Sequence, residues 1–338
     1  MKVLVVGGAG YIGSHCVKQL LRAGDEPIVL DNLVYGHRRA VPPRVPLLEG
    51  SLGDQELVSR LLREYRPDAV MHFAAYAFVG ESISAPMKYY RNNVVNTLLL
   101  LESMLAAGVH RFVFSSTCAT FGIPEQVPIP DGAPQRPINP YGQTKLDIEN
   151  ALRALAAATP LRFAALRYFN AAGADPDGEI GEDHDPETHL IPLVLKVALG
   201  QRPAVRVFGT DYPTGDGTAV RDFVHVMDLA DAHLSAMRQL DRDAQLFYNL
   251  GTGRGHSVRE VIRTAREVTG REIPVEAAPR RAGDPPVLFA DSRKIRDELG
   301  WAPRIPDLPR IVETAWRWHE ANPQGYADPA GRGSGERE

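Results

Sequence analysis

The glycine-rich turn near the start of the chain constrains the fold more than any other feature. Residues 3–6 form a short apolar run, which predicts a buried strand, and this run leads directly into Gly7-Gly8-Ala9-Gly10-Tyr11-Ile12-Gly13. A helical pattern follows the last glycine. Glycines at this spacing let a pyrophosphate approach the backbone, and the helix N-terminus offers it free N–H groups and partial positive charge. Strand, turn and helix together predict a dinucleotide-binding loop, with a tight turn that binds nothing as the alternative.

The first half of the chain alternates apolar, β-rich runs with helical patterns. We expect strands at residues 3–6, 27–30, 45–48, 69–73, 111–115 and 163–167. We expect helices at residues 11–23, 55–65, 86–107 and 141–158. Strands that alternate with helices of this length predict βαβ units with right-handed crossovers. The predicted fold class is therefore α/β, a doubly wound parallel-sheet Rossmann fold.

The pattern changes after about Asn170. Residues 171–188 are rich in Gly, Asp and Pro and predict irregular structure, and we expect helices at 189–199, 227–239, 257–268 and 308–321. We expect residues 1–170 to form the cofactor-binding Rossmann domain. Residues 171–327 are expected to form mainly a smaller C-terminal α/β substrate-binding subdomain. The last residues, 328–338, are small and polar and predict a flexible tail.

Composition argues against several functional classes. The chain has 338 residues, and its 38 Lys and Arg against 42 Asp and Glu give a net charge of −4. This weak acidity argues against binding to nucleic acid or to an anionic membrane surface. The N-terminal apolar run spans about five residues, too short for a signal sequence or a membrane span. Because two cysteines make no disulfide framework, we expect a reduced, cytoplasmic protein.

A carboxylate stands where the second predicted strand ends. Asp31 follows Gly13 by 18 residues, close to the spacing of about 20 at which an acid contacts the adenosine ribose in dinucleotide-binding folds. Such a carboxylate accepts hydrogen bonds from the ribose hydroxyls and repels a 2′-phosphate, which favours NAD over NADP. Arg38 and Arg39 follow closely and are interpreted as solvated loop charges, although an arginine can hold a 2′-phosphate. The alternative role for Asp31 is to cap a turn or a helix.

Tyr141 and Lys145 form a Y-x-x-x-K motif at the start of a predicted helix. Their i, i+4 spacing puts both side chains on one helical face. A nearby ammonium stabilises a phenolate, so we expect the pKa of Tyr141 to fall from about 10 toward neutrality, where tyrosine acts as a general base. Thr117 follows the strand predicted at 111–115, at the carboxyl end of the sheet, where open α/β folds place reacting groups. We expect Thr117 to share a proton with Tyr141. A chance surface pair is the alternative for this motif when it is found alone.

The sequence predicts no metal site. Two thiols, Cys16 in a predicted helix and Cys118, make no metal site, and His184 and His189 lie in the irregular segment without a ligand spacing typical of a metal centre. We interpret these two histidines as solvated or as lying at the edge of a substrate site.

Longer segments carry a resemblance that covers nearly the whole chain. GGAGYIGSH, HFAAYAFVGES, YYRNNVVNTL, FSSTCATFG and NPYGQTK are typical of the extended short-chain dehydrogenases/reductases. LRYFNAAGA, FGTDYPTGDGTAVRDFVHVMDLADAH, YNLGTG and PRRAGDP are more specific. With these segments the chain resembles the UDP-glucose (UDP-galactose) 4-epimerases of that family. The resemblance implies NAD-dependent, reversible epimerisation of a UDP-hexose at C4 through a transient 4-keto sugar.

The resemblance also implies roles for particular residues. Tyr141 would be the base, Lys145 would tune it, and Thr117 would contact the substrate. Residues implied to bind NAD are Gly7, Gly10, Tyr11, Ile12, Gly13, Asp31, Asn32, Ser51, Leu52, Phe73, Ala74, Ala75, Asn92, Ser115, Tyr141, Lys145 and Tyr168. Residues implied to bind the UDP-sugar are Thr117, Tyr141, Phe169, Asn170, His189, Leu190, Phe208, Arg221, Arg281 and Asp284. Arg221 and Arg281 would bind the diphosphate, because a planar guanidinium is bidentate; an ion pair with Asp222 is the alternative for Arg221.

Four positions depart from the pattern of these epimerases. Ser51 replaces an acid near the adenine, Ala77 replaces a lysine that contacts the cofactor, and Phe121 lacks the hydroxyl of a tyrosine. Leu288 stands where some members carry a bulky tyrosine that narrows the sugar pocket. A smaller residue there leaves N-acetylated sugars open as substrates.

Other functions remain as alternatives. A UDP-pentose 4-epimerase shares the SSTCAT and TDYPTGDGT segments and the UDP site. An NAD-binding sensor without chemistry is disfavoured by the intact Tyr141 and Lys145. A 4,6-dehydratase is disfavoured because Cys118-Ala119 follows the threonine, where that reaction needs an acid pair. The resemblance also implies a homodimer, through a four-helix contact made by the helices at 86–107 and 141–158.

Overall fold

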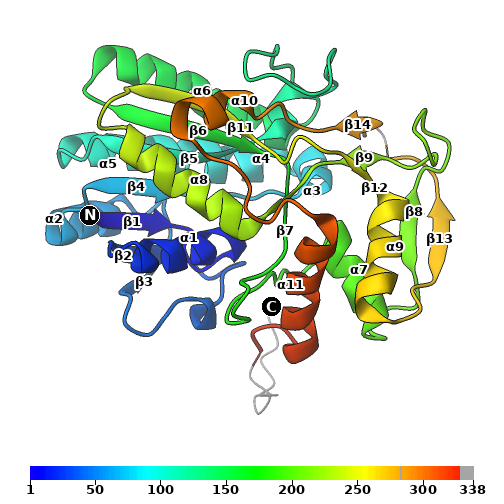
Figure 1. Ribbon diagram of the computed structural model, residues 1–338. Helices are drawn as coiled ribbons and strands as arrows, with labels where there is room; N and C mark the ends of the chain where they lie inside the picture. The colour runs from blue at the N-terminus through cyan, green and yellow to red at the C-terminus, as the bar shows by residue number, and fades with distance from the viewer. Residues whose placement is uncertain (282–283, 328–338) are drawn as a thin grey trace.

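The structure is a computed structural model that describes residues 1–281 and 284–327. The tail predicted at 328–338 lies outside these residues. At the centre is a sheet of seven parallel strands in the order β11-β6-β5-β4-β1-β2-β3 (Figure 1). The order reverses between β1 and β4, so the predicted doubly wound Rossmann fold is confirmed. The strands are β1 (Lys2–Val6), β2 (Glu26–Asp31), β3 (Leu47–Glu49), β4 (Ala69–His72), β5 (Arg111–Thr117), β6 (Arg162–Tyr168) and β11 (Gln245–Leu250).

Helices cover both faces of the sheet, because alternate residues of each strand point to opposite sides. Val3 and Val5 of β1 belong to one apolar core, and Leu4 and Val6 belong to the other. The first core is closed by α1 (Tyr11–Arg22), α8 (Val226–Gln239) and α10 (Arg293–Leu299). The second is closed by α2 (Gln55–Tyr65), α5 (Asn96–Ala106) and α6 (Pro140–Ala158). Burial on both faces explains why the strands are apolar throughout rather than alternating.

The helix expected at residues 86–107 contains a wider turn. α4 (Pro86–Tyr89) continues into a π-helical segment, η2 (Tyr90–Val95), before α5 begins. In this segment the Asn93 amide donates to the Tyr76 carbonyl at 3.0 Å, and its oxygen accepts the Tyr76 N–H at 2.9 Å. A π-helical turn inside an α-helix is frequently found at a functional site, and the neighbouring Asn92 lines the cleft described below.

The second half of the chain does not form a separate unit after residue 170. α8 packs beside α1, and β11 pairs with β6 of the central sheet, so residues 226–250 return to the Rossmann layers. The smaller lobe lies at one end of the sheet (Figure 1). It contains β7 (Asn170–Ala172), α7 (Leu190–Ala198), β8 (Val205–Phe208), β9 (Val220–Arg221), β10 (Phe223–His225), β12 (His256–Ser257), α9 (Val258–Thr269), β13 (Val275–Ala278), β14 (Val287–Leu288) and α11 (Leu308–Ala321).

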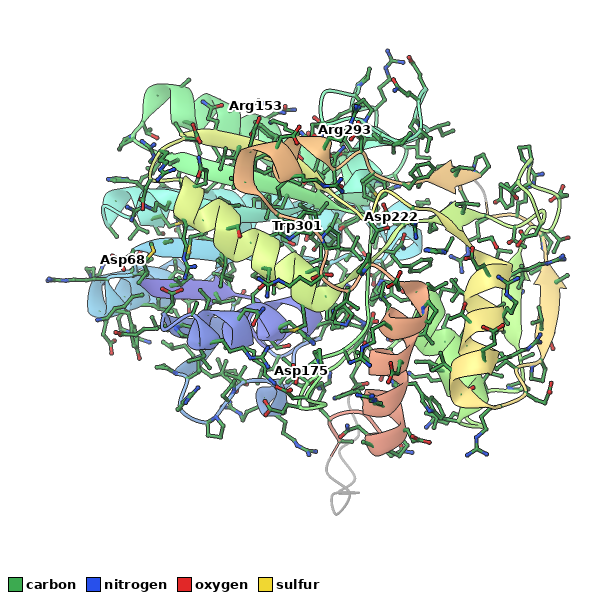
Figure 2. The ribbon with its side chains drawn as sticks, viewed as in Figure 1. Asp68, Arg153, Asp175, Asp222, Arg293 and Trp301 are labelled. Carbon is green, nitrogen blue, oxygen red and sulfur yellow. The ribbon has the colours of Figure 1, made fainter. Side chains whose placement is uncertain are left out.

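Asp222 ties the two parts together at their junction (Figure 2). Its buried carboxylate accepts hydrogen bonds from the Thr252 N–H at 2.9 Å and the Thr252 hydroxyl at 2.7 Å. It also accepts from the N–H groups of Gly253 at 3.3 Å and Ala290 at 3.1 Å. A buried carboxylate is tolerated where its oxygens are satisfied in this way. The junction is therefore held by backbone bonds from two distant loops.

No helix in the described part of the chain combines the length and the apolar character that a membrane span requires.

Candidate active site

A cleft with a volume of about 300 Å³ lies at the carboxyl ends of β1 and β4. The glycine turn after β1 lines it, as do Phe73, Ala74 and Ala75 after β4. Thr117, Tyr141 and Lys145 line the same cleft. Doubly wound sheets bind ligands at the point where the strand order reverses, and β1 and β4 flank that point here.

The glycines of the turn are required for two different reasons. A Cβ on Gly7, whose φ is +80°, would lie 2.5 Å from the Ala74 nitrogen, and a Cβ on Gly13 would lie 2.1 Å from the Gly7 carbonyl oxygen. These two glycines allow close packing of turn, strand and helix. A Cβ on Gly10 would meet only that carbonyl within 4 Å among the described residues, at 3.4 Å. Gly10 is also the N-cap of α1 and contributes no side-chain cap, so the turn suits a pyrophosphate that approaches the backbone.

Asp31 lines the cleft at the end of β2 and also caps the turn beside it. Its Oδ2 accepts the Ala9 N–H and its Oδ1 accepts the Leu33 N–H, each at 2.9 Å. Burial raises the pKa of Asp31, and these two bonds oppose the rise. Since each carboxylate oxygen has a second lone pair, the turn cap and a contact to ribose hydroxyls are compatible.

The two arginines after Asp31 differ from each other. Arg38 forms an exposed ion pair with Glu49 at 2.6 Å, which fits a solvated loop charge. Arg39 donates to the backbone carbonyls of Tyr326 and Ala327 at 2.9 and 3.1 Å. Arg39 is exposed, as expected of a solvated loop charge, and it also binds the segment that follows α11.

The start of α6 presents Tyr141 and Lys145 to the cleft. Asn139 caps the helix by accepting the Gly142 N–H at 2.8 Å, and Pro140 occupies the first turn, where its missing N–H costs nothing. Lys145 is 4% exposed, donates to the Ser115 carbonyl at 2.8 Å and lies 4.8 Å from the centre of the Phe114 ring. Burial lowers the pKa of Lys145 to about 7.

The pKa of Tyr141 moves in the direction opposite to the one expected. Burial raises it well above its usual value, and the Thr117 hydroxyl opposes that rise. The ammonium of Lys145 is directed to the Ser115 carbonyl, and desolvation disfavours the phenolate. The expectation of a lowered pKa is therefore wrong for the protein's own side chains, and further positive charge is needed to form the phenolate.

Ser115 and Ser51 do not line the cleft, although both are predicted to bind NAD. Ser115 is 1% exposed, and its hydroxyl lies 2.5 Å from that of Tyr168, which does line the cleft. Ser115 therefore positions Tyr168 and Lys145 from behind. Ser51 is exposed and accepts the Gly53 N–H at 3.1 Å. The other predicted NAD-binding residues, including Ile12, Asn32 and Leu52, all line the cleft.

The residues predicted to bind the UDP-sugar fall into two groups. Phe169, Asn170, His189 and Leu190 line the cleft together with Thr117 and Tyr141. The remaining four, from the smaller lobe, do not line it and form two contacting pairs. Arg221 lies 2.5 Å from the Asp284 carboxylate, and the guanidinium carbon of Arg281 lies 4.0 Å from the centre of the Phe208 ring.

Arg221 pairs with Asp284 rather than with Asp222. The alternative ion pair with Asp222 is not formed, because Asp222 is bound to backbone N–H groups and the Arg221 guanidinium contacts Asp284. Burial raises the pKa of Cys118 to about 12, and the charge of Arg221 works against this rise. The guanidinium therefore acts on the residue that follows Thr117.

The positions that depart from the epimerase pattern have distinct surroundings. Ala77 lines the cleft, so its short side chain leaves room there. Phe121 is 1% exposed and packs with Ile129, Phe169 and Ala290, with Leu288 at the border of this group. Phe121 thus serves packing, and a hydroxyl at this position would be buried.

Sequence reasoning missed part of the cleft wall. Val34, Tyr35 and Glu182 also line it, in loops that no motif marks, and so do Tyr76 and Phe78, which lie within HFAAYAFVGES but have no role implied by the resemblance. His184 was expected to be solvated or at a substrate edge. Its side chain is 16% exposed, and with His189 it meets the carboxylates of Glu182 and Glu187 at this wall.

Known proteins resemble the chain over nearly its full length. Residues 3–251 match the model of the NAD dependent epimerase/dehydratase family. A UDP-glucose 4-epimerase of Lacticaseibacillus casei is 51% identical over 329 residues, which cover 97% of this chain and 99% of that protein. The crystal structure of UDP-glucose 4-epimerase from Brucella ovis in complex with NAD is 50% identical, with a TM-score of 0.91 and coverage of 93% of this chain and 97% of that one. The structure from Bifidobacterium longum in complex with NAD+ and UDP is 38% identical, with a TM-score of 0.93 and coverage of 96% and 100%.

Proposed function

This chain belongs to the NAD dependent epimerase/dehydratase family, and we propose that it catalyses the NAD-dependent, reversible epimerisation of a UDP-hexose at C4. The substrates are UDP-galactose and UDP-glucose, with a transient 4-keto sugar between them. The observation that carries the proposal is that Thr117, Tyr141 and Lys145 meet the glycine turn in one cleft. UDP-glucose 4-epimerases 51% identical over 97% of the chain support it.

The glycine turn, Asp31 and Asn92 would hold NAD. The open face of Gly10, the α1 N-terminus without a side-chain cap and the carboxylate at the end of β2 fit a dinucleotide. Bound NAD supplies a hydride acceptor for C4 of the sugar, and its reduced form supplies the hydride that inverts the centre. Asp31 repels a 2′-phosphate, so NAD is preferred over NADP.

Tyr141 accepts the proton of the sugar 4-hydroxyl as the C4–H bond breaks, and it returns the proton when the inverted alcohol forms. Burial keeps the pKa of Tyr141 high in the protein alone. The phenolate therefore depends on positive charge from Lys145 and the oxidised nicotinamide together. Thr117 lowers the pKa of Tyr141, and its hydroxyl oxygen would accept a hydrogen bond from the sugar 4-hydroxyl.

The smaller lobe would anchor UDP while the sugar turns over. Arg221 and Arg281 belong to this lobe, where they contact Asp284 and Phe208, and would offer two planar forks for a diphosphate. Asp284, which contacts Arg221 at 2.5 Å, would accept a uridine ribose hydroxyl, and Phe208 would pack on the uracil. Binding energy from this remote group retains a 4-keto sugar that would otherwise dissociate.

We further propose that the protein is a homodimer formed through the helical segment 86–107, which comprises α4, η2 and α5, together with α6. Apolar side chains on consecutive elements beside α6 are exposed, namely Ile83 at 62%, Met87 at 64%, Val95 at 48% and Leu98 at 40%. Exposed apolar side chains that gather on one surface mark an interface. Sedimentation should give a dimer for the native chain and a monomer for Val95→Glu/Leu98→Glu. A native monomer would contradict this part of the proposal.

Tyr141→Phe tests the assignment of the base. The variant keeps the buried ring and loses the hydroxyl, so turnover of UDP-galactose should fall by about 10²- to 10⁴-fold. Calorimetric titration should show that NAD and UDP bind as in the native protein. Tyr65→Phe, on α2, removes a hydroxyl away from the cleft and is the matched control. Near-normal turnover by Tyr141→Phe would defeat the assignment.

A further inference from the structure

Four side chains with metal-binding chemistry meet in the loop between β7 and α7. Glu182, His184, Glu187 and His189 each direct one donor atom inward, and the four atoms all lie within 4.8 Å of one another. Glu182, His184 and His189 also line the cleft wall. The four residues of this cluster do not include Thr117, Tyr141 or Lys145, so the cluster is distinct from the side chains proposed to transfer the proton.

The separations between these atoms match a coordination shell. His184 Nδ1 lies 3.3 Å from Glu182 Oε1 and 3.7 Å from Glu187 Oε2. A tetrahedral Zn²⁺ with bonds of about 2.0–2.1 Å places its ligand atoms about 3.3 Å apart. His189 Nδ1 is closer to Glu182 Oε1, at 2.6 Å, and would separate from it by some tenths of an ångström around an ion.

A second observation concerns atoms that lack a partner. His184 Nδ1 and Glu187 Oε2 are buried and have no hydrogen-bond partner among the described residues. The Glu187 side chain is 3% exposed and that of Glu182 is 4% exposed. Buried carboxylates are normally paired, fully hydrogen-bonded or bound to a metal. The unpartnered Glu187 oxygen faces the histidine at 3.7 Å, a gap too long for a hydrogen bond.

The Glu187 carboxylate is already oriented by the backbone. Its Oε1 accepts the N–H groups of Thr188 at 2.7 Å and His189 at 2.8 Å. Such supporting hydrogen bonds fix a ligating carboxylate before the ion binds, as they do in metal centres generally. Oε2 is left for coordination.

We propose that Glu182, His184, Glu187 and His189 together bind one Zn²⁺ per chain. Imidazole nitrogens with carboxylate oxygens suit this ion, and two carboxylates with two neutral imidazoles balance its charge. Four protein ligands make a closed, structural site, in contrast to catalytic sites that keep one position for water. The inference rests on these four residues and not on the proposed epimerase activity.

The ion would fix the wall of the cleft that carries two predicted substrate residues. His189 is the N-cap of α7, and Leu190 is the first residue of that helix. The His184 ring also meets the ring of Tyr11 edge-on, with centroids 6.2 Å apart, which links the loop to the glycine turn. Binding of the ion would therefore order the segment 182–189 against both the turn and α7.

Protons are the competing occupants. Burial lowers the pKa of His184, but Glu182 and Glu187 outweigh this effect and raise it to about 10. Two imidazolium rings would also balance two carboxylates. The experiment must therefore count the ions bound and the protons released, because a closed zinc site expels the protons that the histidines carry.

The test uses the full chain, produced without a histidine tag, stripped with a chelator and titrated with Zn²⁺ alone. We expect one Zn²⁺ per chain by elemental analysis after gel filtration, release of protons in calorimetry, and a rise in Tm. Co²⁺ should give the visible d–d bands of a tetrahedral site. Glu187→Gln and His184→Ala should each weaken Zn²⁺ binding by at least about 100-fold, since loss of a supporting residue alone commonly costs 10- to 100-fold.

His256→Ala is the matched control. It removes another histidine that contacts a glutamate, Glu260 at 2.8 Å, and it should retain one Zn²⁺ per chain. The proposal would be overturned if the stripped native chain bound no Zn²⁺. It would also be overturned if Glu187→Gln and His184→Ala both bound Zn²⁺ as tightly as the native chain. The native titration decides the question even if a variant fails to fold.

Discussion

Two glycines of the same turn should respond to alanine in different ways. A Cβ on Gly13 would lie 2.1 Å from the carbonyl oxygen of Gly7, and a backbone oxygen cannot rotate away as a flexible side chain can. A Cβ on Gly10 would lie 3.4 Å from the same oxygen, which is close to ordinary contact. We therefore expect Gly13→Ala to destabilise the fold, and Gly10→Ala to weaken cofactor binding while the fold stays nearly as stable.

The magnitudes follow from these two distances. Overpacking against rigid structure costs about 1–3 kcal/mol. Unfolding entropy of about 2 cal/mol/K per residue gives roughly 0.7 kcal/mol/K for a chain of this length, so Gly13→Ala should lower Tm by about 1.5–4 °C. At Gly10 the added methyl group would keep a pyrophosphate from the backbone. Loss of one charge-assisted hydrogen bond costs about 1.5–3 kcal/mol, which weakens NAD binding by about 10- to 150-fold.

Scanning calorimetry of the protein after removal of its bound nucleotide, and calorimetric titration of that protein with NAD, separate the two effects. Gly80→Ala, on the short helix α3 (Val79–Ser84), is the control, because no described atom lies within 4 Å of the added Cβ. Its Tm should hold or rise slightly, and its NAD affinity should match the native value. Equal losses of Tm in the Gly10 and Gly13 variants, or native NAD affinity in Gly10→Ala, would refute this reasoning.

Two further predictions concern the core and the cofactor. Glu149→Gln should lower the free energy of unfolding by about 3–5 kcal/mol, because it leaves Arg167, now held at 2.9 and 2.6 Å, buried without its counter-charge; denaturant titration measures this. Burial raises the pKa of Glu149, but the contacts to Arg167 outweigh it and hold the pKa below 4.5. The stabilisation by Glu149 is therefore complete above pH 4.5 and is lost as the pH falls through the lower pKa of Glu149 in the folded protein. The variant should then lose less stability on acidification than the native protein. The same loss of unfolding free energy at low pH in both proteins would contradict the role of the pair. Asp31→Asn should narrow the preference for NAD over NADP in the ratio of the two Kd values, and an unchanged ratio would count against Asp31 as the selective group.

Much of the Rossmann part can be predicted from the sequence because its determinants are local. Buried parallel strands are continuous apolar runs, and the helix at 55–65 is observed with the predicted bounds. The glycine turn and the Y-x-x-x-K motif depend on spacings of a few residues. Such short spacings can be read directly from the sequence, and the residues of both motifs line the cleft.

Other features depend on contacts between distant segments, which the sequence does not display. β11 pairs with β6, and the paired residues Gln245 and Phe163 are 82 positions apart in the sequence. No short sequence motif therefore indicates where β11 lies in the sheet. Burial of Tyr141 is also a property of the folded chain, and it reverses the expected pKa shift. The sequence itself disfavours a pairing of Arg221 with Asp222, since neighbours in an extended strand point to opposite sides.

The most direct test of the account is conversion of UDP-galactose by the purified protein without added NAD. The account predicts that UDP-glucose forms, because NAD stays bound in the cleft through purification and is regenerated beside the base in each turnover. Absence of UDP-glucose, even after NAD is supplied, would contradict C4 epimerisation of UDP-hexoses by this chain.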